Sequence, residues 1–441
     1  MTPLIALLAA LNVGPFVDGF MAKKMAEDHI PGAVFVFVHD GKVVYAKGYG
    51  LADVERKVPV SPDKTVWRIG SITKAVTATA VMQLVDRGKV ELDRDVNDYL
   101  RSVKVPATYP RPITVRDLLD HTAGLDEIRP GTQAPSAGEL LPLADFLRPR
   151  LVRVRPSGEI ISYSTYGMTL AGLLIEDVSG LSYRDYLARH IWAPLRMRRA
   201  SVHVPTDDRD FAVGYELKNG ALVRQPWEWY HTAPASSMNA TALEMAAFIR
   251  AHLNRGAPLL GPAAATEMHR QQITMHPKIP GYALGFYEDF VGSLRVLEHG
   301  GNVAGISTLM VLVPSHGDGF FIAGHFESSK LRDDLKYALL EHLYAEARTR
   351  HPVPAPKGGD VRRYAGLYIP TTSCHSCKPP SAPSTIRVTA NEDGTITFAG
   401  GKWTEVEPGL FVRAEGTGYI VFRGDKYVFA GGFWSWEKVG D

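Results

Sequence analysis

The sequence predicts an α/β protein in which an antiparallel sheet is flanked by helices, followed by a small all-β domain. Apolar runs rich in β-branched and aromatic residues at 33–38 and 43–46 enclose a D-G turn, which predicts a hairpin. Because the runs are almost continuously hydrophobic, the hairpin is expected in a sheet covered on both faces. Further strands are predicted at residues 281–286, 296–302, 307–313 and 320–324, and a helix at 331–348.

Between the hairpin and the later strands the pattern is mainly helical. Helices are predicted over residues 71–87, 168–178, 183–190 and 242–253. A hairpin, a helical middle, a series of antiparallel strands and a final helix together describe an α/β sandwich with an inserted helical lobe.

A domain boundary is predicted at the Pro/Gly-rich stretch 352–359. We therefore expect a large domain at residues 1–351, a linker at 352–359 and a small domain at 360–441. Short strands separated by turns, at residues 385–389, 395–398, 419–422 and 426–429, predict that the small domain is an all-β module of the barrel type.

Composition excludes some classes of function. The 441 residues are 45% hydrophobic and 10% aromatic, as in a globular protein with a sizeable core. The net charge of +2 argues against a general nucleic-acid binder. Residues 148–155 alternate arginine or proline with apolar residues, which favours a strand with one solvated face over a basic patch.

Two cysteines, Cys374 and Cys377, are present. A structural zinc site normally needs a second ligand pair, and none is evident, so a local disulfide or two free thiols are favoured over a metal. The C-x-x-C spacing also matches redox motifs, but it lies among Ser and Pro without a β-α-β context. No metal or cofactor is expected.

The N-terminal region does not decide the compartment. No run reaches the ~18 apolar residues of a spanning helix, so no membrane span is expected. Residues 4–11 form a short apolar run, which is either the remnant of a secretion signal or the start of an amphipathic helix through Phe16, Phe20, Met21 and Met25. An extracytoplasmic location is favoured over a cytoplasmic one, and the oligomeric state stays open.

The tetrapeptide Ser71-Ile72-Thr73-Lys74 stands at the start of a mostly apolar helix. Ser is a favoured N-cap, so a purely structural role is the simple interpretation of Ser71. Lys74 lies on the same helix face one turn later. A lysine that faces inward must be paired or have a lowered pKa, which is one way to activate a serine nucleophile.

Two later motifs strengthen the functional interpretation of this tetrapeptide. They are Tyr163-Ser164-Thr165 and His299-Gly300-Gly301. In this order, the three motifs resemble those of the class C β-lactamase and D-alanyl-D-alanine peptidase superfamily. The flanking residues 67–71 and 113–125 also resemble that family's sequences. The likeness covers roughly residues 25–350 and is greatest to the esterase-like branch. The start of the small domain, at 363–368, resembles a lipocalin-like module found in some of these hydrolases.

The resemblance implies a β-lactamase/transpeptidase-like fold and a set of roles. Ser71 would form an acyl-enzyme, and Lys74 and Tyr163 would share the role of base, with a neighbouring cation lowering the pKa of the phenol. Tyr163 would return the proton to the leaving group and activate water. The backbone N–H groups of Ser71 and Asn302 would form the oxyanion hole. Gly300 and Gly301 would keep the strand narrow enough for a ligand to approach.

Two positions depart from the family pattern. Thr165 replaces an asparagine whose amide holds the substrate's side-chain amide, and a hydroxyl cannot provide both the donor and the acceptor of an amide. His299 replaces a lysine that holds the substrate carboxylate, and a histidine is a weaker anion anchor near neutral pH. Both changes favour esters, or amides without such anchors.

A few other polar and aromatic residues are weaker candidates for the functional site. Trp227, Trp229 and Tyr230 are candidates for a cleft wall, although core packing explains them equally well. His121 can be catalytic, but a packed structural histidine at a helix end is favoured.

The leading functional hypothesis is a cofactor-free serine hydrolase that acts on small or medium carboxylic esters. The alternatives are a β-lactamase or D-amino-acid-specific peptidase, and, outside enzymes, a penicillin-binding acceptor or sensor that is acylated without turnover. The expected partner is accordingly a small-molecule ester, β-lactam or D-peptide.

Overall fold

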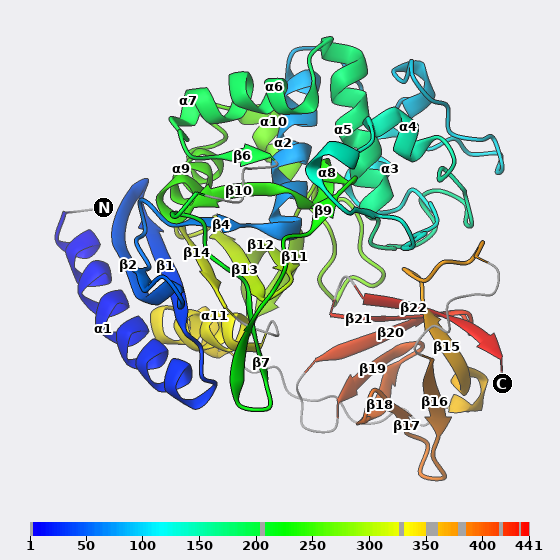
Figure 1. Ribbon diagram of the computed structural model, residues 1–441. Helices are drawn as coiled ribbons and strands as arrows, with labels where there is room; N and C mark the ends of the chain where they lie inside the picture. Colours follow the sequence, from blue (N-terminus) through cyan, green and yellow to red (C-terminus); the bar gives the residue numbers. More distant parts are fainter. Residues whose placement is uncertain are drawn as a thin grey trace.

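The computed structural model describes residues 3–202, 208–325, 330–349, 360–377, 385–413, 418–431 and 434–440, with side chains from residue 13 onward (Figure 1). Its α-helices are α1 (Pro3–Glu27), α2 (Thr73–Asp86), α3 (Val115–Leu119), α4 (Leu143–Leu147), α5 (Thr165–Ser179), α6 (Tyr183–Leu187), α7 (Ala193–Leu195), α8 (Ala233–Ser236), α9 (Ala242–Leu253), α10 (Pro262–His269) and α11 (Lys330–Leu343).

The strands of the large domain are β1 (Gly32–His39), β2 (Lys42–Asp53), β3 (Val58–Pro59), β4 (Val66–Arg68), β5 (Gln133–Ala134), β6 (Ser201–Val202), β7 (Tyr215–Lys218), β8 (Ala221–Arg224), β9 (Trp229–Tyr230), β10 (Met238–Thr241), β11 (Tyr287–Val291), β12 (Leu294–Val303), β13 (Ile306–Val313) and β14 (Asp318–Gly324). Those of the small domain are β15 (Gly366–Pro370), β16 (Ile386–Ala390), β17 (Ile396–Phe398), β18 (Gly401–Glu407), β19 (Leu410–Arg413), β20 (Tyr419–Arg423), β21 (Tyr427–Ala430) and β22 (Trp434–Gly440).

The centre of the large domain is a seven-stranded antiparallel sheet in the order β11-β12-β13-β14-β1-β2-β3. The predicted hairpin is confirmed as β1 and β2. Every residue of β1 is buried, because helices cover both faces of the sheet at this strand. The strands predicted at 296–302, 307–313 and 320–324 are confirmed as β12, β13 and β14.

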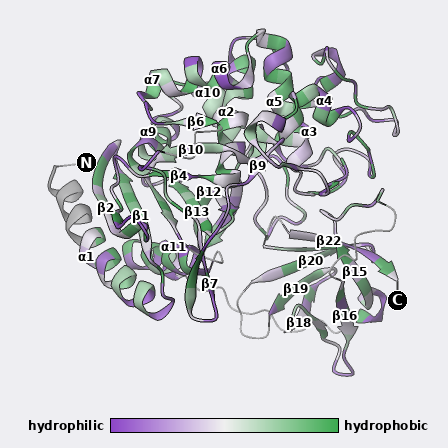
Figure 2. Cartoon of the chain, viewed as in Figure 1, coloured by the Kyte–Doolittle hydropathy of each residue, from purple (hydrophilic) through white to green (hydrophobic). Residues whose placement is uncertain are grey.

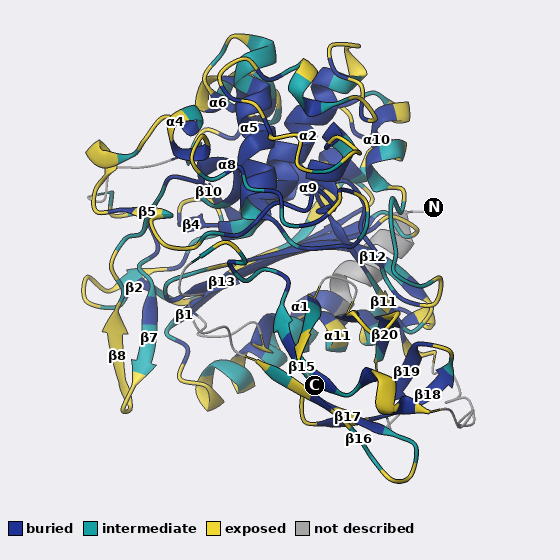
Figure 3. Cartoon of the chain, turned by 90° about the vertical axis from the view of Figure 1, so that its right-hand side faces the viewer, coloured by how far each residue is buried: buried dark blue, intermediate teal, exposed yellow. Residues whose placement is uncertain are grey.

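Helices α1 and α11 pack on one face of the sheet, and the helical lobe that contains α2, α5 and α9 packs on the other (Figure 1). Green ribbon in Figure 2 marks the hydrophobic residues of β1 and β13. In Figure 3 the same strands, together with α2 and α5, are the buried centre of the molecule. The predicted α/β sandwich with a helical lobe is therefore confirmed.

Helix α1 is amphipathic over its described side chains. Val13, Val17 and Met21 are buried in the core between α1, α11 and the sheet, and Phe16 and Phe20 pack against that core. No helix within the described part of the chain combines the length and hydrophobicity needed to cross a bilayer.

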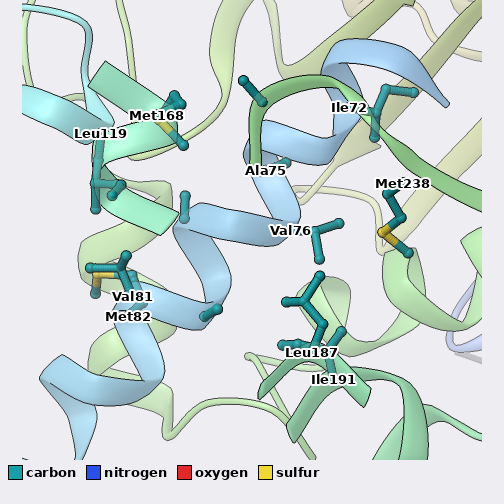
Figure 4. Packing of buried hydrophobic residues seen from close by; sticks show 14 of the residues in the cluster. Ile72, Ala75, Val76, Val81, Met82, Leu119, Met168, Leu187, Ile191 and Met238 are labelled. Atoms are coloured by element: carbon teal, nitrogen blue, oxygen red, sulfur yellow. The ribbon is translucent and has the colours of Figure 1, made fainter. Parts of the chain in front are cut away.

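Helix α2 runs through the middle of the helical lobe and is buried from Thr73 to Leu84. Figure 4 shows the apolar side chains around it, with Leu119 and Met168 on one side and Leu187, Ile191 and Met238 on the other. The helix was predicted to open at Ser71. The structure instead has a 3-10 turn at Gly70–Ile72 and begins the α-helix at Thr73.

Three segments differ from the predictions. Residues 281–286 form no strand, and β11 begins only at Tyr287. The helix predicted to reach residue 348 ends at Leu343, and a 3-10 turn follows at Glu346–Arg348. Residues 148–155 are not a half-solvated strand either. Arg153 and Arg155 are buried because Arg153 donates to the Arg111 carbonyl and Arg155 pairs with Glu437 of the small domain.

The small domain is a closed eight-stranded barrel, β15 to β22, which confirms the all-β prediction. The predicted linker at 352–359 lies outside the described residues. Cys374 and Cys377 form a disulfide in the loop after β15, with an S–S distance of 1.98 Å. The barrel packs on the large domain through apolar contacts made by Ile160 and Ile279.

Gly172 permits the close contact between α5 and α8. A Cβ at Gly172 would lie 2.2 Å from Cγ of Pro234, so Gly172→Ala should force the two helices apart. We expect the overpacking, typically about 1–3 kcal/mol, to exceed the roughly 1 kcal/mol that alanine gains in helix propensity. Chemical denaturation should therefore show a lower free energy of unfolding.

Gly19→Ala is the matched control, because Gly19 lies inside α1 and a Cβ there would meet no atom within 4 Å. It should be neutral or stabilising. A Gly172→Ala variant as stable as Gly19→Ala would contradict the tight α5–α8 contact.

Candidate active site

Ser71 lies in the 3-10 turn between β4 and α2, where it is half-buried and lines a cavity of about 370 Å³. Its side chain does not cap the helix, since neither the turn nor α2 has a side-chain N-cap hydrogen bond. The turn is held instead by Thr73, whose hydroxyl donates to the Gly70 carbonyl. The capping interpretation of Ser71 is therefore wrong, and its hydroxyl is available for chemistry.

Lys74 is 1% exposed, and its Nζ lies 3.1 Å from Ser71 Oγ. Burial lowers the pKa of Lys74 to about 7, against a smaller opposing effect of Glu127. Nζ donates to the Ala235 carbonyl at 2.9 Å. That carbonyl is positioned by α8, whose Pro234 carbonyl accepts from Thr77 of α2. With one hydrogen directed at Ala235, a neutral amine can direct its lone pair at Ser71.

Tyr163 hydrogen bonds to Ser71 through its hydroxyl, and its ring centre lies 4.7 Å from Lys74 Nζ. The expectation that a neighbouring cation leaves this phenol with a lowered pKa is wrong. Burial raises the pKa of Tyr163 well above its usual value, and the charge of nearby Glu127 acts in the same direction. The physical reason is that the desolvation of the buried phenol outweighs the charge of Arg332, the cation that acts to lower this pKa. Tyr163 is therefore a phenol at neutral pH.

His121 supports the segment that carries Tyr163. It is 1% exposed, its Nδ1 accepts from the Ser164 backbone N–H at 3.1 Å, and its ring lies 4.6 Å from that of Tyr163. Burial lowers the pKa of His121 well below its usual value, so the ring is neutral. The packed structural role favoured from the sequence fits these contacts.

Glu127 is a site residue that the sequence did not reveal. Its Oε1 accepts from the Ser164 hydroxyl at 2.8 Å and from the Tyr166 N–H at 3.2 Å, at the N-terminus of α5. Burial raises the pKa of Glu127, while these hydrogen bonds and Lys74 oppose the shift. Glu127 belongs to no recognisable motif, so the sequence does not predict its role. Its position six residues after His121 is the one feature of the sequence that could have suggested it.

His299 lies on β12 and is fully buried, with its ring 6.3 Å from that of Tyr163. Its Nδ1 lies 2.8 Å from the Gly300 carbonyl, which can only accept, so Nδ1 carries the hydrogen and Nε2 is an acceptor. Burial lowers the pKa of His299 to about 3. The residue is neutral at physiological pH and does not offer a positive charge to a carboxylate.

The open edge of β12 lies next to Ser71. Pairing with β11 ends at Tyr287 and Glu298, and the Gly300 N–H beyond it donates to the Tyr287 hydroxyl. Because alternate N–H groups of a strand point to the same side, the Asn302 N–H also faces this open edge.

The close approach of β12 to the nucleophile's turn depends on Gly301. A Cβ at Gly301 would lie 2.0 Å from the Ile69 carbonyl oxygen, and one at Gly70 would lie 3.0 Å from Asn302 N. Asn302 N is therefore close to the turn that carries Ser71. This geometry supports the predicted pairing of the Ser71 and Asn302 N–H groups as an oxyanion hole.

Thr165 begins α5, directly after its N-cap Ser164, and does not line the cavity that contains Ser71. Trp227 lines a different cavity, where its ring lies 4.5 Å from the Arg68 guanidinium. Trp229 and Tyr230 form β9, which pairs with β5. The structure thus brings together Ser71, Lys74, Tyr163, His299 and Asn302, but it does not place Trp227 with them.

Residues of β11, β12, α11 and the barrel also line the Ser71 cavity, and we call them its wall. Their charged groups differ in exposure. Lys336, 3% exposed, is enclosed by Asp289 at 2.8 Å and Glu298 at 3.0 Å. Arg332 is turned to the Gly301 and Thr308 carbonyls. Asp333 is the more exposed charge, at 41%. The cations of this wall are directed inward and an acid faces solvent.

The chain is similar to known proteins in sequence and in fold. The Beta-lactamase family model matches residues 17–344. Protein flp of Staphylococcus aureus (strain N315) is 26% identical over 334 residues, covering 74% of this chain and 66% of flp. This chain therefore spans slightly less than two thirds of that relative.

Two solved structures share the fold. The octameric penicillin-binding protein homologue from Pyrococcus abyssi has a TM-score of 0.67 and 24% identity, covering 97% of this chain and 100% of its own. EstCE1, a hydrolase with promiscuous acyltransferase activity, has a TM-score of 0.66 and 20% identity, covering 77% of this chain and 100% of its own.

The charge of Glu127 should be visible in a pH profile. An ionised Glu127 raises the pKa of Lys74, so Glu127→Gln should lower it and preserve an acceptor for Ser164. We expect the acid limb of the rate of Ser71 acylation, set near pH 7 by Lys74, to move to lower pH by up to about one unit. Stopped-flow acylation between pH 5 and 9 measures this shift.

The exposed Glu139→Gln is the control and should leave the limb in place. A limb that moves to higher pH in Glu127→Gln would contradict the coupling.

Proposed function

Because the chain belongs to the beta-lactamase family of serine hydrolases, we propose that it hydrolyses carboxylic esters through an acyl-enzyme on Ser71. The observation that carries the proposal is the buried amine of Lys74, with a pKa near 7, 3.1 Å from Ser71 Oγ. A free serine hydroxyl is a poor nucleophile, and an adjacent base of suitable pKa activates it.

In the proposed acylation, neutral Lys74 takes the Ser71 proton while Oγ attacks the ester carbonyl carbon. The carbonyl oxygen becomes an oxyanion that accepts from the Ser71 and Asn302 N–H groups. Loss of one such donor typically costs about 2.7–4 kcal/mol of transition-state stabilisation. Preformed backbone donors on a rigid turn and a rigid strand favour this step because they need little reorganisation.

The phenol of Tyr163 then completes the proton transfer. Since its pKa is raised, it donates its own proton to the departing alkoxide and regains one from the Lys74 ammonium. The alcohol leaves and the ester bond to Ser71 remains. In deacylation the sequence reverses: water loses its proton through Tyr163 to Lys74, attacks the acyl carbon, and Ser71 Oγ leaves with a proton.

The charge distribution of the cavity supports an ester over a substrate with a carboxylate tail. His299 is neutral, and Lys336 and Arg332 are directed at protein acceptors. Asp333, 41% exposed, pairs with Arg332 at 3.5 Å and so offsets the positive charge of that guanidinium. EstCE1, described as a hydrolase with promiscuous acyltransferase activity, shares this fold, and acyl transfer is the chemistry proposed here.

A β-lactamase or D-amino-acid peptidase is the second candidate. It is supported by the open edge of β12 beside Ser71, where an extended peptide can add as a strand. A penicillin-binding acceptor without turnover is less favoured, because Tyr163 and Lys74 provide a base for deacylation.

The proposal is tested with p-nitrophenyl butyrate and a chromogenic cephalosporin. We expect the wild type to turn over the ester. In Ser71→Ala, kcat should fall about 10³-fold or more, because the nucleophile and its proton-transfer partners act as a unit. Ester hydrolysis that is unchanged in Ser71→Ala would overturn the assignment. Intact mass spectrometry separates the alternatives: cephalosporin turnover supports the second candidate, and a stable adduct on Ser71 without turnover supports the acceptor.

The wall charge predicts a preference that can be measured separately. Phenyl acetate should be hydrolysed faster than 4-acetoxybenzoate, whose leaving group carries a carboxylate, and Asp333→Asn should reduce the difference by about three- to tenfold at low salt. The exposed Asp145→Asn is the control. An unchanged preference in Asp333→Asn would show that this acid does not face the leaving group.

A further inference from the structure

The segment that carries Tyr163 has little regular structure of its own. Residues 160–164 belong to no strand or helix, so their backbone groups must find partners elsewhere. One partner is His121, whose carbonyl accepts from the Ser162 N–H at 2.8 Å. Another partner belongs to the C-terminal barrel.

Two buried hydroxyls of the barrel bind the residues just before Tyr163. Ser435 Oγ donates to the Ile161 carbonyl at 2.8 Å, and Ser162 Oγ donates to Thr371 Oγ1 at 3.0 Å. Thr371 and Ser435 are themselves 2.5 Å apart. Ser162, Thr371 and Ser435 are all at most 5% exposed. These hydroxyls are therefore a dry, continuous link between barrel and segment, in which each hydrogen bond is strengthened by low dielectric.

The disulfide loop of the barrel, at Cys374–Cys377, binds a second segment near Tyr163, the one that contains Asp126 and Glu127. The N–H groups of His375 and Ser376 each donate to Asp126 at 2.9 Å, and the Ser376 hydroxyl donates at 2.6 Å. Asp126 is 1% exposed. Its neighbour Glu127 accepts from Ser164, the residue after Tyr163. The Cys374–Cys377 bond closes the loop whose N–H groups make this carboxylate site.

Arg155 joins the two links. Its guanidinium pairs with Glu437 of β22 at 2.8 Å, donates to the Thr371 carbonyl at 3.3 Å and lies 2.6 Å from His375 Nε2. Its side chain is 3% exposed. A buried arginine satisfied by partners from both barrel segments fixes them relative to each other.

We infer that the barrel is a working part of the active site: Thr371, Ser435 and the Cys374–Cys377 loop, acting through Ile161, Ser162 and Asp126, are positioning residues for Tyr163. The inference rests on the proposed function only in giving Tyr163 a proton-transfer role. A displacement of about 1 Å at a reacting group can cost about 10²-fold in rate. Cutting either link should therefore lower kcat more than it raises KM.

The variants are Thr371→Val with Ser435→Ala, which cuts the hydroxyl link, and Cys374→Ser with Cys377→Ser, which opens the loop. Each is made in the full chain, in the wild-type background and with Tyr163→Phe. Asp393→Asn is the control, because Asp393 is exposed in a barrel turn and its hydrogen bonds within the described part of the chain are to the nearby barrel residues Thr395 and Lys402.

Each double variant should lower kcat for p-nitrophenyl butyrate about 10- to 100-fold, with KM within about twofold. In the Tyr163→Phe background the same changes should have little further effect, because residues that act through one group are not additive. A merely destabilising change would lower the rate equally in both backgrounds. Equal losses, or unchanged kcat in the wild-type background, overturn the inference.

Hydrogen exchange gives a readout that does not need turnover. Peptides covering residues 160–166 should exchange faster in both variants and not in Asp393→Asn, while the α2 peptides stay protected. If the wild type hydrolyses no ester but the 160–166 peptides respond as expected, the proposed substrate fails and the positioning stands. Unchanged exchange at 160–166 overturns the positioning whatever the substrate.

Discussion

The burial of one amine is the constraint on which the rest of the site depends. Lys74 can activate Ser71 only while it is largely uncharged near neutral pH, and burial is the largest cause of its lowered pKa. The surrounding structure maintains that burial: α2 is enclosed on all sides, Gly172 lets α8 approach α5, and α8 supplies the Ala235 carbonyl that orients Nζ. A buried, uncharged lysine is costly for stability, and it is the kind of strain that folds retain at functional sites.

Burial also determines the charge of the groups around the cavity, and it leaves the cavity without a free cation to hold a substrate carboxylate among the residues described here. Groups that would hold a carboxylate are either replaced by the neutral His299 or directed at protein acceptors, as Arg332 and Lys336 are. The groups proposed for acyl transfer come from other parts of the chain: the turn before α2, α2 itself, the segment before α5 and the backbone of β12. In the proposed function, wall residues can therefore affect substrate choice without contacting the proposed nucleophile and base. The barrel also contributes, since its buried hydroxyls bind Ile161 and Ser162, which precede Tyr163.

Much of this arrangement could be predicted from local pattern. Ser71 and Lys74 are one helical turn apart, so their contact follows from helix geometry, and the hairpin follows from the D-G turn. What failed depended on long-range contacts. The raised pKa of Tyr163 follows from its burial, which only the folded chain shows. The sequence pattern predicted Arg155 in a half-solvated strand, because its partner Glu437 lies 282 residues away in the sequence. Glu127 stands in a motif-free loop, and only the fold brings it to Ser164.

The charge state of Lys74 is the central claim, and it can be measured directly. In protein labelled with ¹³Cε-lysine, the Lys74 resonance, assigned by its absence in Lys74→Arg, can be followed from pH 5 to 11 by NMR. The account predicts a titration midpoint near 7. A midpoint near the ordinary lysine value of about 10.4 would mean that Lys74 is a cation at neutral pH, and would contradict its role as the base that activates Ser71.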